Sequence, residues 1–189
     1  TPSSSALVFY WGVEGNYNEL EIHNILFSKN YKKEFDDLFV RKKYPDDPTV
    51  YIYISSKFRK DDAPDGYENW FVMINVPYLN GEENTNEIDK ARKTIQEKIN
   101  NILKIDLTGK IVFEKILSPS LIQKQTGSYK GSIYGISSNN RNAAFLRQKN
   151  RSKEYKGLYF CGGSAHPGGG IPLVLLSGKI ASEEIMRYE

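Results

Sequence analysis

The sequence predicts an α+β fold in which a mixed β-sheet with covering helices is followed by a C-terminal strand, loop and helix. Three observations lead to this prediction. Short runs of β-branched and aromatic residues recur between polar turns. Segment 86–103 has a strong helical period. A glycine-rich turn joins a last apolar run to a last helix. The order of these elements indicates the class, but it does not determine the topology of the sheet.

Four segments of the first half illustrate the pattern. The run 6–11 (ALVFYW) is apolar throughout and predicts a strand inside a sheet. Segment 31–39 has apolar residues at helical spacing. The runs 50–54 and 70–76 are rich in β-branched and aromatic residues and stand next to Pro- or Asp-rich breaks, so we expect a strand in each.

The clearest helix covers 86–103, because its apolar residues share one face while Lys and Glu occupy the other. Asn84, followed by Glu87, is a candidate N-cap. The apolar residues of this face are Ile88, Ala91, Ile95, Ile99, Ile102 and Leu103.

The last third predicts a strand over 110–117 and a short helix that begins at Pro119 and ends at Gly127. Loop or irregular strand follows to about residue 142. Segment 157–161 then reads as a strand, and 172–188 as a helix whose all-round apolar start predicts burial.

Composition excludes several classes of protein. The 189 residues, 39% hydrophobic and 13% aromatic, suffice for a globular core. A net charge of +3, with no basic block, argues against nucleic acid as a partner. The single cysteine excludes an intramolecular disulfide and fits a cytoplasmic protein. No apolar run approaches the roughly 20 residues that span a bilayer. The chain opens without Met, directly before an apolar run, so we expect a fragment of a longer protein.

The segment 158–172 (LYFCGGSAHPGGGIP) has the composition of a ligand-binding turn. Glycines let a ligand approach the backbone, and the first turn of a helix offers unpaired N–H groups with partial positive charge. An anionic or electron-rich group would suit this place. The spacing matches neither a P-loop nor a G-x-G-x-x-G turn. A purely structural role, as a tight strand-to-helix connection, remains an equal alternative.

The same segment resembles the C-terminal signature of phytoene dehydrogenases, the carotenoid desaturases of the FAD-dependent, amine oxidase-like superfamily. The resemblance is carried by 157–163 (GLYFCGG), 166–172 (HPGGGIP) and 176–179 (LSGK). It implies that 1–118 belong to a substrate-binding domain and that 119–189 return to an FAD-binding domain whose N-terminal nucleotide-binding unit is missing. The residues it implies at the flavin are Gly162, Gly163, His166, Pro167, Gly168, Gly169, Gly170 and Ile171.

Further blocks extend the resemblance over nearly the whole chain, and they include 3–12, 23–28, 47–51, 70–77 and 127–135. The resemblance implies that the intact enzyme transfers a hydride from a carotenoid precursor to FAD and so desaturates a long apolar isoprenoid at a membrane surface. The blocks near His23 and Thr49 are closer to the hydroxycarotenoid 3,4-desaturase branch. A carotenoid isomerase of the same family and a non-catalytic binding domain remain alternatives.

Single residues add little catalytic information. Two histidines, His23 and His166, make a multi-histidine metal site implausible, and we expect none. His166 is either a proton carrier or a support for its loop, while His23 is more typical of packing. Ser164 and His166 lack an orienting carboxylate for a triad. Cys161, at the end of an apolar run, is expected to be an inert core residue. No catalytic acid or base is evident.

Two larger groups have both an ordinary and a functional interpretation. Three arginines before the loop either face water or meet a flavin phosphate; they are Arg141, Arg147 and Arg151. Six aromatic residues either fill the core or line a polyene tunnel; they are Tyr10, Trp11, Tyr51, Tyr53, Trp70 and Phe71. We expect the chain alone to retain no FAD, to be inactive, and to self-associate through the apolar face of its last helix.

Overall fold

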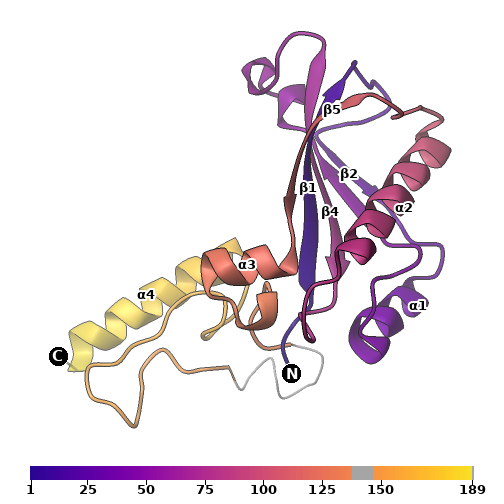
Figure 1. The fold of residues 1–189 in the computed structure, drawn as a ribbon. Helices are drawn as coiled ribbons and strands as arrows, with labels where there is room; N and C mark the ends of the chain where they lie inside the picture. Colours follow the sequence, from indigo (N-terminus) through magenta and orange to yellow (C-terminus); the bar gives the residue numbers. More distant parts are fainter. Residues whose placement is uncertain (138–146, 189) are drawn as a thin grey trace. The chain divides into compact units, whose positions relative to one another are not determined.

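The computed structural model describes residues 1–137 and 147–188 (Figure 1). The chain forms two compact units. The larger comprises Ser4–Gly131, and the smaller comprises Thr1–Ser3 with Ser132–Glu189. The assignment of 1–118 and 119–189 to a substrate-binding and an FAD-binding domain stays a prediction, because compactness alone says nothing about the ligand of either unit.

The larger unit is built on a five-stranded sheet in the order β2-β3-β4-β1-β5. Every neighbouring pair is antiparallel, so the α+β class is confirmed while the sheet is antiparallel and not mixed. The pairs β2–β3 and β3–β4 join strands that follow one another in the chain, whereas β1 lies between β4 and β5, which both come much later in the sequence. The strands are β1 (Ser5–Glu14), β2 (His23–Leu26), β3 (Val50–Tyr53), β4 (Tyr67–Val76) and β5 (Ile111–Leu117).

β1 is an interior strand of the sheet, between β4 and β5, as its continuous apolar run predicts. It pairs with β4 along its whole length, from Ser5 opposite Val76 to Glu14 opposite Tyr67, and with β5 on its other edge. The ladder with β5 shifts register between Gly12 and Val13. Residues 8–13 of β1 are therefore paired with a neighbouring strand on both edges.

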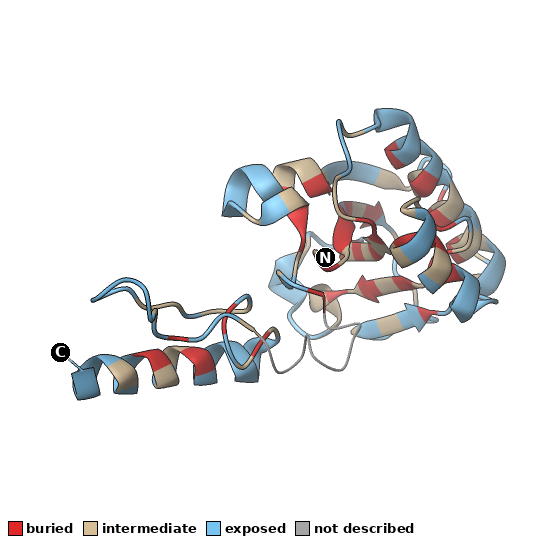
Figure 2. Ribbon diagram, turned by 90° about the horizontal axis from the view of Figure 1, so that it is seen from below, coloured by how far each residue is buried: buried red, intermediate tan, exposed pale blue. Residues whose placement is uncertain are grey.

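One face of this sheet is covered by α2 (Thr85–Leu103), as Figures 1 and 2 show. Alternate residues of β4 are buried against it and the others are not, which is the period of a strand with one packed face. The helix contributes Ile88, Ala91, Ile95 and Ile99 to the core. The expected cap is also present, since Asn84 Oδ1 accepts a hydrogen bond from the Asn86 N–H at 3.0 Å.

The segment predicted as a helix over 31–39 is divided in two. α1 (Tyr31–Phe35) continues as a π-helix, η1 (Asp36–Arg41), and ends where Lys42 adopts a left-handed φ of 54°. The side chain of Asp37 is 1% exposed and accepts from Lys33 at 3.0 Å and from Arg41 at 3.1 Å. The wide turn therefore surrounds one buried carboxylate with basic side chains.

α3 (Pro119–Thr126) begins with the expected proline and ends at Gly127, whose φ of 71° suits glycine. Ser118 does not cap it. Its hydroxyl instead donates to Glu83 Oε2 at 2.7 Å, and Glu83 Oε1 accepts the Ser120 N–H at 3.1 Å. The carboxylate of Glu83 therefore takes the place of a capping serine. Short 3₁₀ turns complete the unit: η2 (Ser55–Lys57), η3 (Lys60–Asp62) and η4 (Tyr129–Gly131).

The smaller unit contains α4 (Ile171–Tyr188), one residue longer than predicted at its start. The strand predicted over 157–161 is instead a single bridge, Tyr159 opposite Arg151. Only two backbone hydrogen bonds hold it, from Ser152 to Leu158 and from Phe160 to Asn150, which is too short a ladder for a strand. The prediction that α4 is buried is wrong for this structure. Among its described residues only Ser177 and Ala181 are buried.

Candidate functional site

The backbone of the glycine loop requires glycine at three of its positions. Gly162, Gly168 and Gly170 have φ angles of 109°, 137° and 99°. L-residues with a side chain rarely adopt such angles. His166 and Pro167 lie between them, joined by a cis peptide bond. The loop therefore follows a path that only a glycine-rich sequence allows.

Two other glycines allow close packing. A Cβ atom built on Gly169 would lie 2.7 Å from Cδ1 of Tyr134, and one on Gly163 would lie 3.6 Å from Cα of Gly169. The surroundings of Gly162 and Gly170 are different, because a Cβ there meets no described atom within 4 Å. One part of the loop is thus packed within its own unit, and another part presents bare backbone.

Asn150 holds the loop to the helix that follows it. Its Nδ2 lies 3.0 Å from the Phe160 carbonyl oxygen, 2.9 Å from that of His166 and 3.0 Å from Ser177 Oγ, and the residue is buried. The Ser177 hydroxyl in turn accepts the Gly162 N–H at 3.1 Å. One buried amide therefore connects the segment before the loop, the loop and α4. A lone Asn in a polar run has no periodicity, so no sequence pattern predicts this role.

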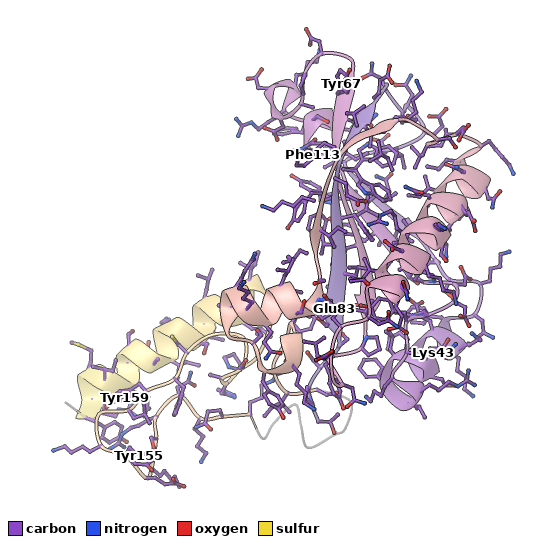
Figure 3. All side chains as sticks on the ribbon, in the orientation of Figure 1. Lys43, Tyr67, Glu83, Phe113, Tyr155 and Tyr159 are labelled. Carbon is purple, nitrogen blue, oxygen red and sulfur yellow. The ribbon has the colours of Figure 1, made fainter. Side chains whose placement is uncertain are left out.

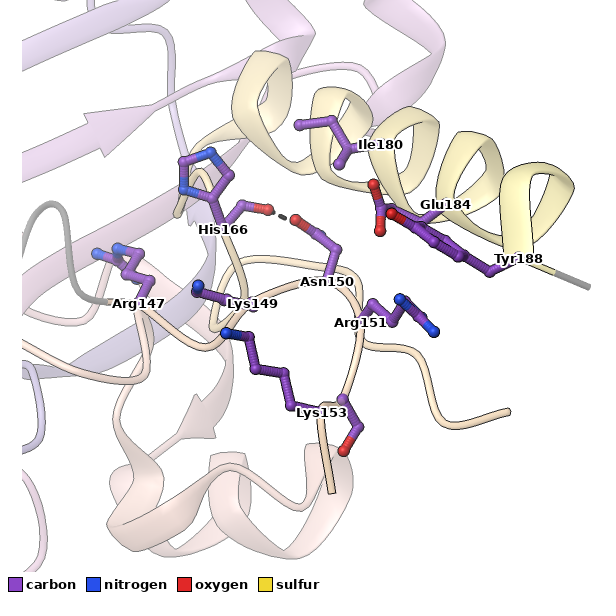
Figure 4. Close-up of a pocket in the computed structure, with 10 residues that line it drawn as sticks. Arg147, Lys149, Asn150, Arg151, Lys153, His166, Ile180, Glu184 and Tyr188 are labelled. Atoms are coloured by element: carbon purple, nitrogen blue, oxygen red, sulfur yellow. Dashed lines mark hydrogen bonds between the residues drawn. The ribbon is translucent and has the colours of Figure 1, made fainter. Parts of the chain in front are cut away.

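His166 supports the loop with its backbone. Its N–H donates to Gln148 at 2.8 Å and its carbonyl accepts from Asn150. The imidazole borders a cavity of about 560 Å³, shown in Figure 4, with Glu184 and Tyr188 of α4 on another side. The supporting role is thus visible in the main chain. A role of the ring as a proton carrier stays a prediction.

The arginines before the loop have structural partners. Arg147 Nη1 donates to the Gly163 carbonyl at 3.0 Å, and the Arg151 guanidinium lies 3.7 Å from the centre of the Tyr188 ring. Arg141 lies outside the described residues. Contact of any of these arginines with a flavin phosphate stays a prediction.

Ser164 packs closely against the backbone of Gly135, and in the described part of the chain no carboxylate is bonded to the His166 ring. A nucleophilic triad built on Ser164 and His166 is therefore not supported by the described residues. Cys161 is exposed, so the prediction of a core cysteine is wrong; the bridge is confined to Tyr159 and does not extend to Cys161, two residues later. Within residues 1–137 and 147–188, no cluster of three His, Cys, Asp or Glu side chains suits a metal ion.

The larger unit has a second feature of interest, on the sheet face opposite α2. We call the aromatic face the set Tyr10, His23, Tyr51, Tyr53 and Phe71. Three pairs of rings are in contact across neighbouring strands. The distances between ring centres are 5.5 Å from Tyr10 to Phe71, 6.2 Å from Phe71 to Tyr51, and 5.0 Å from His23 to Tyr53. Burial raises the pKa of Tyr51, with a further contribution from Tyr53.

A largely apolar cavity of about 630 Å³ adjoins this face. Tyr53 and Phe71 line it together with Tyr67 of β4 and Phe113 of β5, both labelled in Figure 3. Trp11 and Trp70 are 2% and 1% exposed and belong to the core. The six aromatics of interest therefore divide into four on the outer face and two tryptophans in the interior.

No helix in the described part of the chain is both long and apolar enough to cross a membrane. The structure thus offers an aromatic sheet face in one unit and a glycine loop before an apolar helix in the other. Both are candidate surfaces for a ligand, and neither carries a metal cluster or a triad in the part of the chain described.

Comparison with known proteins gives the family. No family model matches the chain. It aligns over 97–100% of its length with carotenoid-modifying enzymes at 34–53% identity, and it belongs to the carotenoid desaturase and oxygenase family. The chain spans 38% of the length of these relatives.

Two kinds of relative carry this result. A 1-hydroxycarotenoid 3,4-desaturase of Flavobacterium sp. (strain P99-3) is 53% identical over 183 residues. The 4,4'-diaponeurosporene oxygenases of Staphylococcus haemolyticus (strain JCSC1435) and Staphylococcus aureus (strain bovine RF122 / ET3-1) are 34% and 36% identical over 189 residues.

Proposed function

We propose that the chain is part of an FAD-dependent desaturase that acts on a hydroxylated carotenoid. The observation that carries this proposal is the 53% identity to a 1-hydroxycarotenoid 3,4-desaturase, against 34–36% to the oxygenases. The similarity supports the hydroxycarotenoid alternative better than a phytoene dehydrogenase, the main expectation from the sequence. Desaturation removes two hydrogens from adjacent carbons and extends the conjugated system.

The glycine loop fits a flavin. The φ angles of Gly162 and Gly170 exclude side chains and their surroundings are open, so a flat ring can approach the backbone. The first turn of α4 adds N–H groups that no preceding helical carbonyl accepts. When bound, FAD would supply the hydride acceptor. The residues proposed to contact it are Gly162, Gly163, His166, Pro167, Gly168, Gly169, Gly170 and Ile171.

In this proposal the chain itself orients the cofactor. Backbone N–H groups at a helix N-terminus stabilise negative charge, such as that of a reduced flavin. Asn150 and Ser177 keep the loop in the required path through their hydrogen bonds. No side chain of the described residues is assigned the proton that desaturation releases.

The aromatic face is the proposed contact for the polyene. Its rings and the adjacent cavity offer an apolar surface on which a flat conjugated chain excludes water. Because such a substrate dissolves in lipid, we propose that the protein works at a membrane surface. The chain alone, which spans 38% of its relatives, is expected to bind FAD weakly and to be inactive.

The test uses the complete product of the reading frame that contains this chain, with its visible spectrum recorded after purification. Liposomes loaded with a 1-hydroxycarotenoid, or with phytoene, are then supplied with the protein, and pigments are separated by chromatography. We expect flavin absorbance and a gain of one double bond in the hydroxylated substrate. Conversion of phytoene alone would favour a phytoene dehydrogenase. A protein without flavin that leaves both pigments unchanged would favour a binding domain with a structural loop.

A second candidate follows from the similarity to oxygenases. If the product of a carotenoid incubation carries new oxygen, detected as a mass gain of one oxygen atom, the chain belongs with the oxygenase branch. Isomerisation, in contrast, would change the retention time of the pigment without any change in mass. The same chromatographic run with mass detection therefore separates desaturation, oxygenation and isomerisation.

A further inference from the structure

His23 and Tyr51 form a polar pair within the aromatic face. The Tyr51 hydroxyl lies 2.8 Å from Nδ1 of His23. The two residues come from neighbouring antiparallel strands, where His23 stands opposite Tyr53 and Ile25 opposite Tyr51. They are thus diagonal neighbours, close enough for side-chain contact on one face.

The imidazole is held in a defined orientation. It stacks on Tyr53 with 5.0 Å between ring centres and an interplanar angle of 23°, and lies nearly parallel to Tyr51 at 16°. Within residues 1–137 and 147–188, the His23 ring makes its hydrogen bond through Nδ1, and no group bonds to Nε2. The pair therefore presents one free ring nitrogen on a face whose other side chains are aromatic rings, two of them the phenols of Tyr10 and Tyr53.

Either tautomer of His23 leaves this pair able to bind an alcohol. If the Tyr51 hydroxyl donates to Nδ1, Nε2 carries the proton and donates outward. If Nδ1 donates to the Tyr51 oxygen, Nε2 accepts and the tyrosine hydroxyl is free to donate. A hydroxyl group is both donor and acceptor, so it complements the pair in both states. A plain polyene has neither function.

The pair can distinguish a carotenoid with a hydroxyl group from one without it, because leaving a polar group without a hydrogen bond costs free energy. A ligand that covers the aromatic face without a hydroxyl removes water from the pair and returns nothing, whereas an alcohol replaces that water. Sites built to bond a hydroxyl reject analogues that lack it more strongly than apolar pockets reject an extra group.

We propose that His23 and Tyr51 hold the hydroxyl group of the carotenoid and thereby select it over the same polyene without a hydroxyl. The inference rests on the proposed function, because it assigns the polar end of that substrate. In this proposal the polar end of the substrate lies at the edge of the sheet formed by β2 and β3. Specificity for the hydroxyl group is determined there.

The experiment compares His23→Phe and Tyr51→Phe with the unchanged full-length protein. His23→Phe retains a ring that can stack on Tyr53, and Tyr51→Phe removes a single oxygen. Tyr31→Phe is the matched control, since Tyr31 lies on α1 and contacts Phe35, away from the aromatic face. Binding of a 1-hydroxycarotenoid and of its parent without the hydroxyl is measured by quenching of tryptophan fluorescence in detergent micelles, and kcat/KM is measured in liposomes.

We expect each test variant to bind the hydroxylated carotenoid about five- to tenfold more weakly and the parent at least as tightly as the unchanged protein does, with the control unaffected. An equal loss for both carotenoids would overturn the proposal, as would variants that lose stability in urea but retain the preference. Binding that distinguishes the two carotenoids in a protein that desaturates neither would leave the inference standing and refute the proposed function.

Discussion

Asn150 shows how much of a loop can depend on one amide. Its two N–H groups are shared among the carbonyls of Phe160, His166 and Ser177 and the Ser177 hydroxyl. Because the residue is buried, the acceptors have little access to water as a substitute. The amide therefore holds the backbone of the loop in its observed conformation without any contact to a ligand.

Replacing Asn150 by Ala should loosen the loop and the start of α4. We expect the free energy of local opening to fall by about 1–3 kcal/mol, because buried acceptors lose their donor. Amide hydrogen exchange of segment 158–180, followed by mass spectrometry, measures this directly. Asn101→Ala, at an exposed site on α2, is the control. Equal protection in Asn150→Ala and the unchanged chain would show that the amide is dispensable.

Two glycines near this amide should respond in opposite ways to an added methyl group. Gly169→Ala places a Cβ 2.7 Å from the Tyr134 ring, so the ring or the loop must move and stability should fall. Gly178→Ala meets no described atom within 4 Å and lies inside α4, where alanine is favoured over glycine by about 0.5–1 kcal/mol. Opening of α4, again by hydrogen exchange, should therefore become easier in the first variant and harder in the second. If both substitutions changed the opening of α4 in the same direction, the packing described for Gly169 and Gly178 would be contradicted.

The α1–η1 segment and the turn that follows it concentrate charge around two carboxylates, Asp37 and Asp46. Burial raises the pKa of Asp37, but the hydrogen bond from Lys33 and the nearby Lys43 and Arg41 lower it overall. Hydrogen bonds from Lys43 and Lys33 likewise lower the pKa of Asp46. Two basic side chains thus serve both acids, and the segment behaves as a single electrostatic network.

This network should make stability depend on pH. A carboxylate with a lowered folded pKa stabilises the fold above its unfolded value of about 3.9 and loses that effect as pH falls through the folded pKa. We therefore expect the free energy of unfolding in urea, followed by tryptophan fluorescence, to decrease from pH 5 downward. Asp37→Asn should be less stable at neutral pH and show a shallower decrease in acid. A variant with the same slope as the unchanged chain would exclude Asp37 as its source.

The success of sequence-based prediction differed between elements for physical reasons. Helix 86–103 was predicted because its burial follows a local period, and α3 because proline and glycine mark its ends. The antiparallel order of the sheet depends on contacts between distant residues, such as Tyr10 with Phe71 and Lys115, which no local pattern contains. The strand at 157–161 failed because a β-branched or aromatic run also needs partners to pair with.

The candidate site divides in the same way. The glycines of the loop were found from composition, since their conformational freedom is a property of the residue itself. The amide of Asn150 and the pair of His23 with Tyr51 were not found, because each depends on which segments fold together. The predicted flavin contacts at Gly162–Ile171 remain predictions, as does every contact with a substrate.

For the chain as a unit in solution, the exposed residues of α4 are the feature with the largest expected effect. Ile171, Leu175 and Met186 are 79%, 70% and 86% exposed, and further apolar residues lie between them. So many exposed apolar side chains on one helix favour contact with another molecule. Self-association is therefore the expectation, as the apolar composition of this helix predicts.

Light scattering coupled to size-exclusion chromatography tests this expectation over a range of protein concentration. We expect the apparent mass of the chain to rise with concentration, and Leu175→Lys with Met186→Lys to suppress the rise. Val40→Lys, which changes an equally exposed apolar residue in η1, is the control for added charge. A chain that stays monomeric at the highest concentration would refute the prediction.

The interior place of β1 in its sheet, between two strands that come later in the chain, also has a consequence for biosynthesis. Its two partners, β4 and β5, are far downstream in the chain, so an apolar strand leaves the ribosome well before either edge can be paired. During that interval Leu7, Phe9 and Trp11 are exposed to other nascent chains. We expect the yield of soluble protein to depend on chaperone capacity and translation speed more than on the stability of the finished fold.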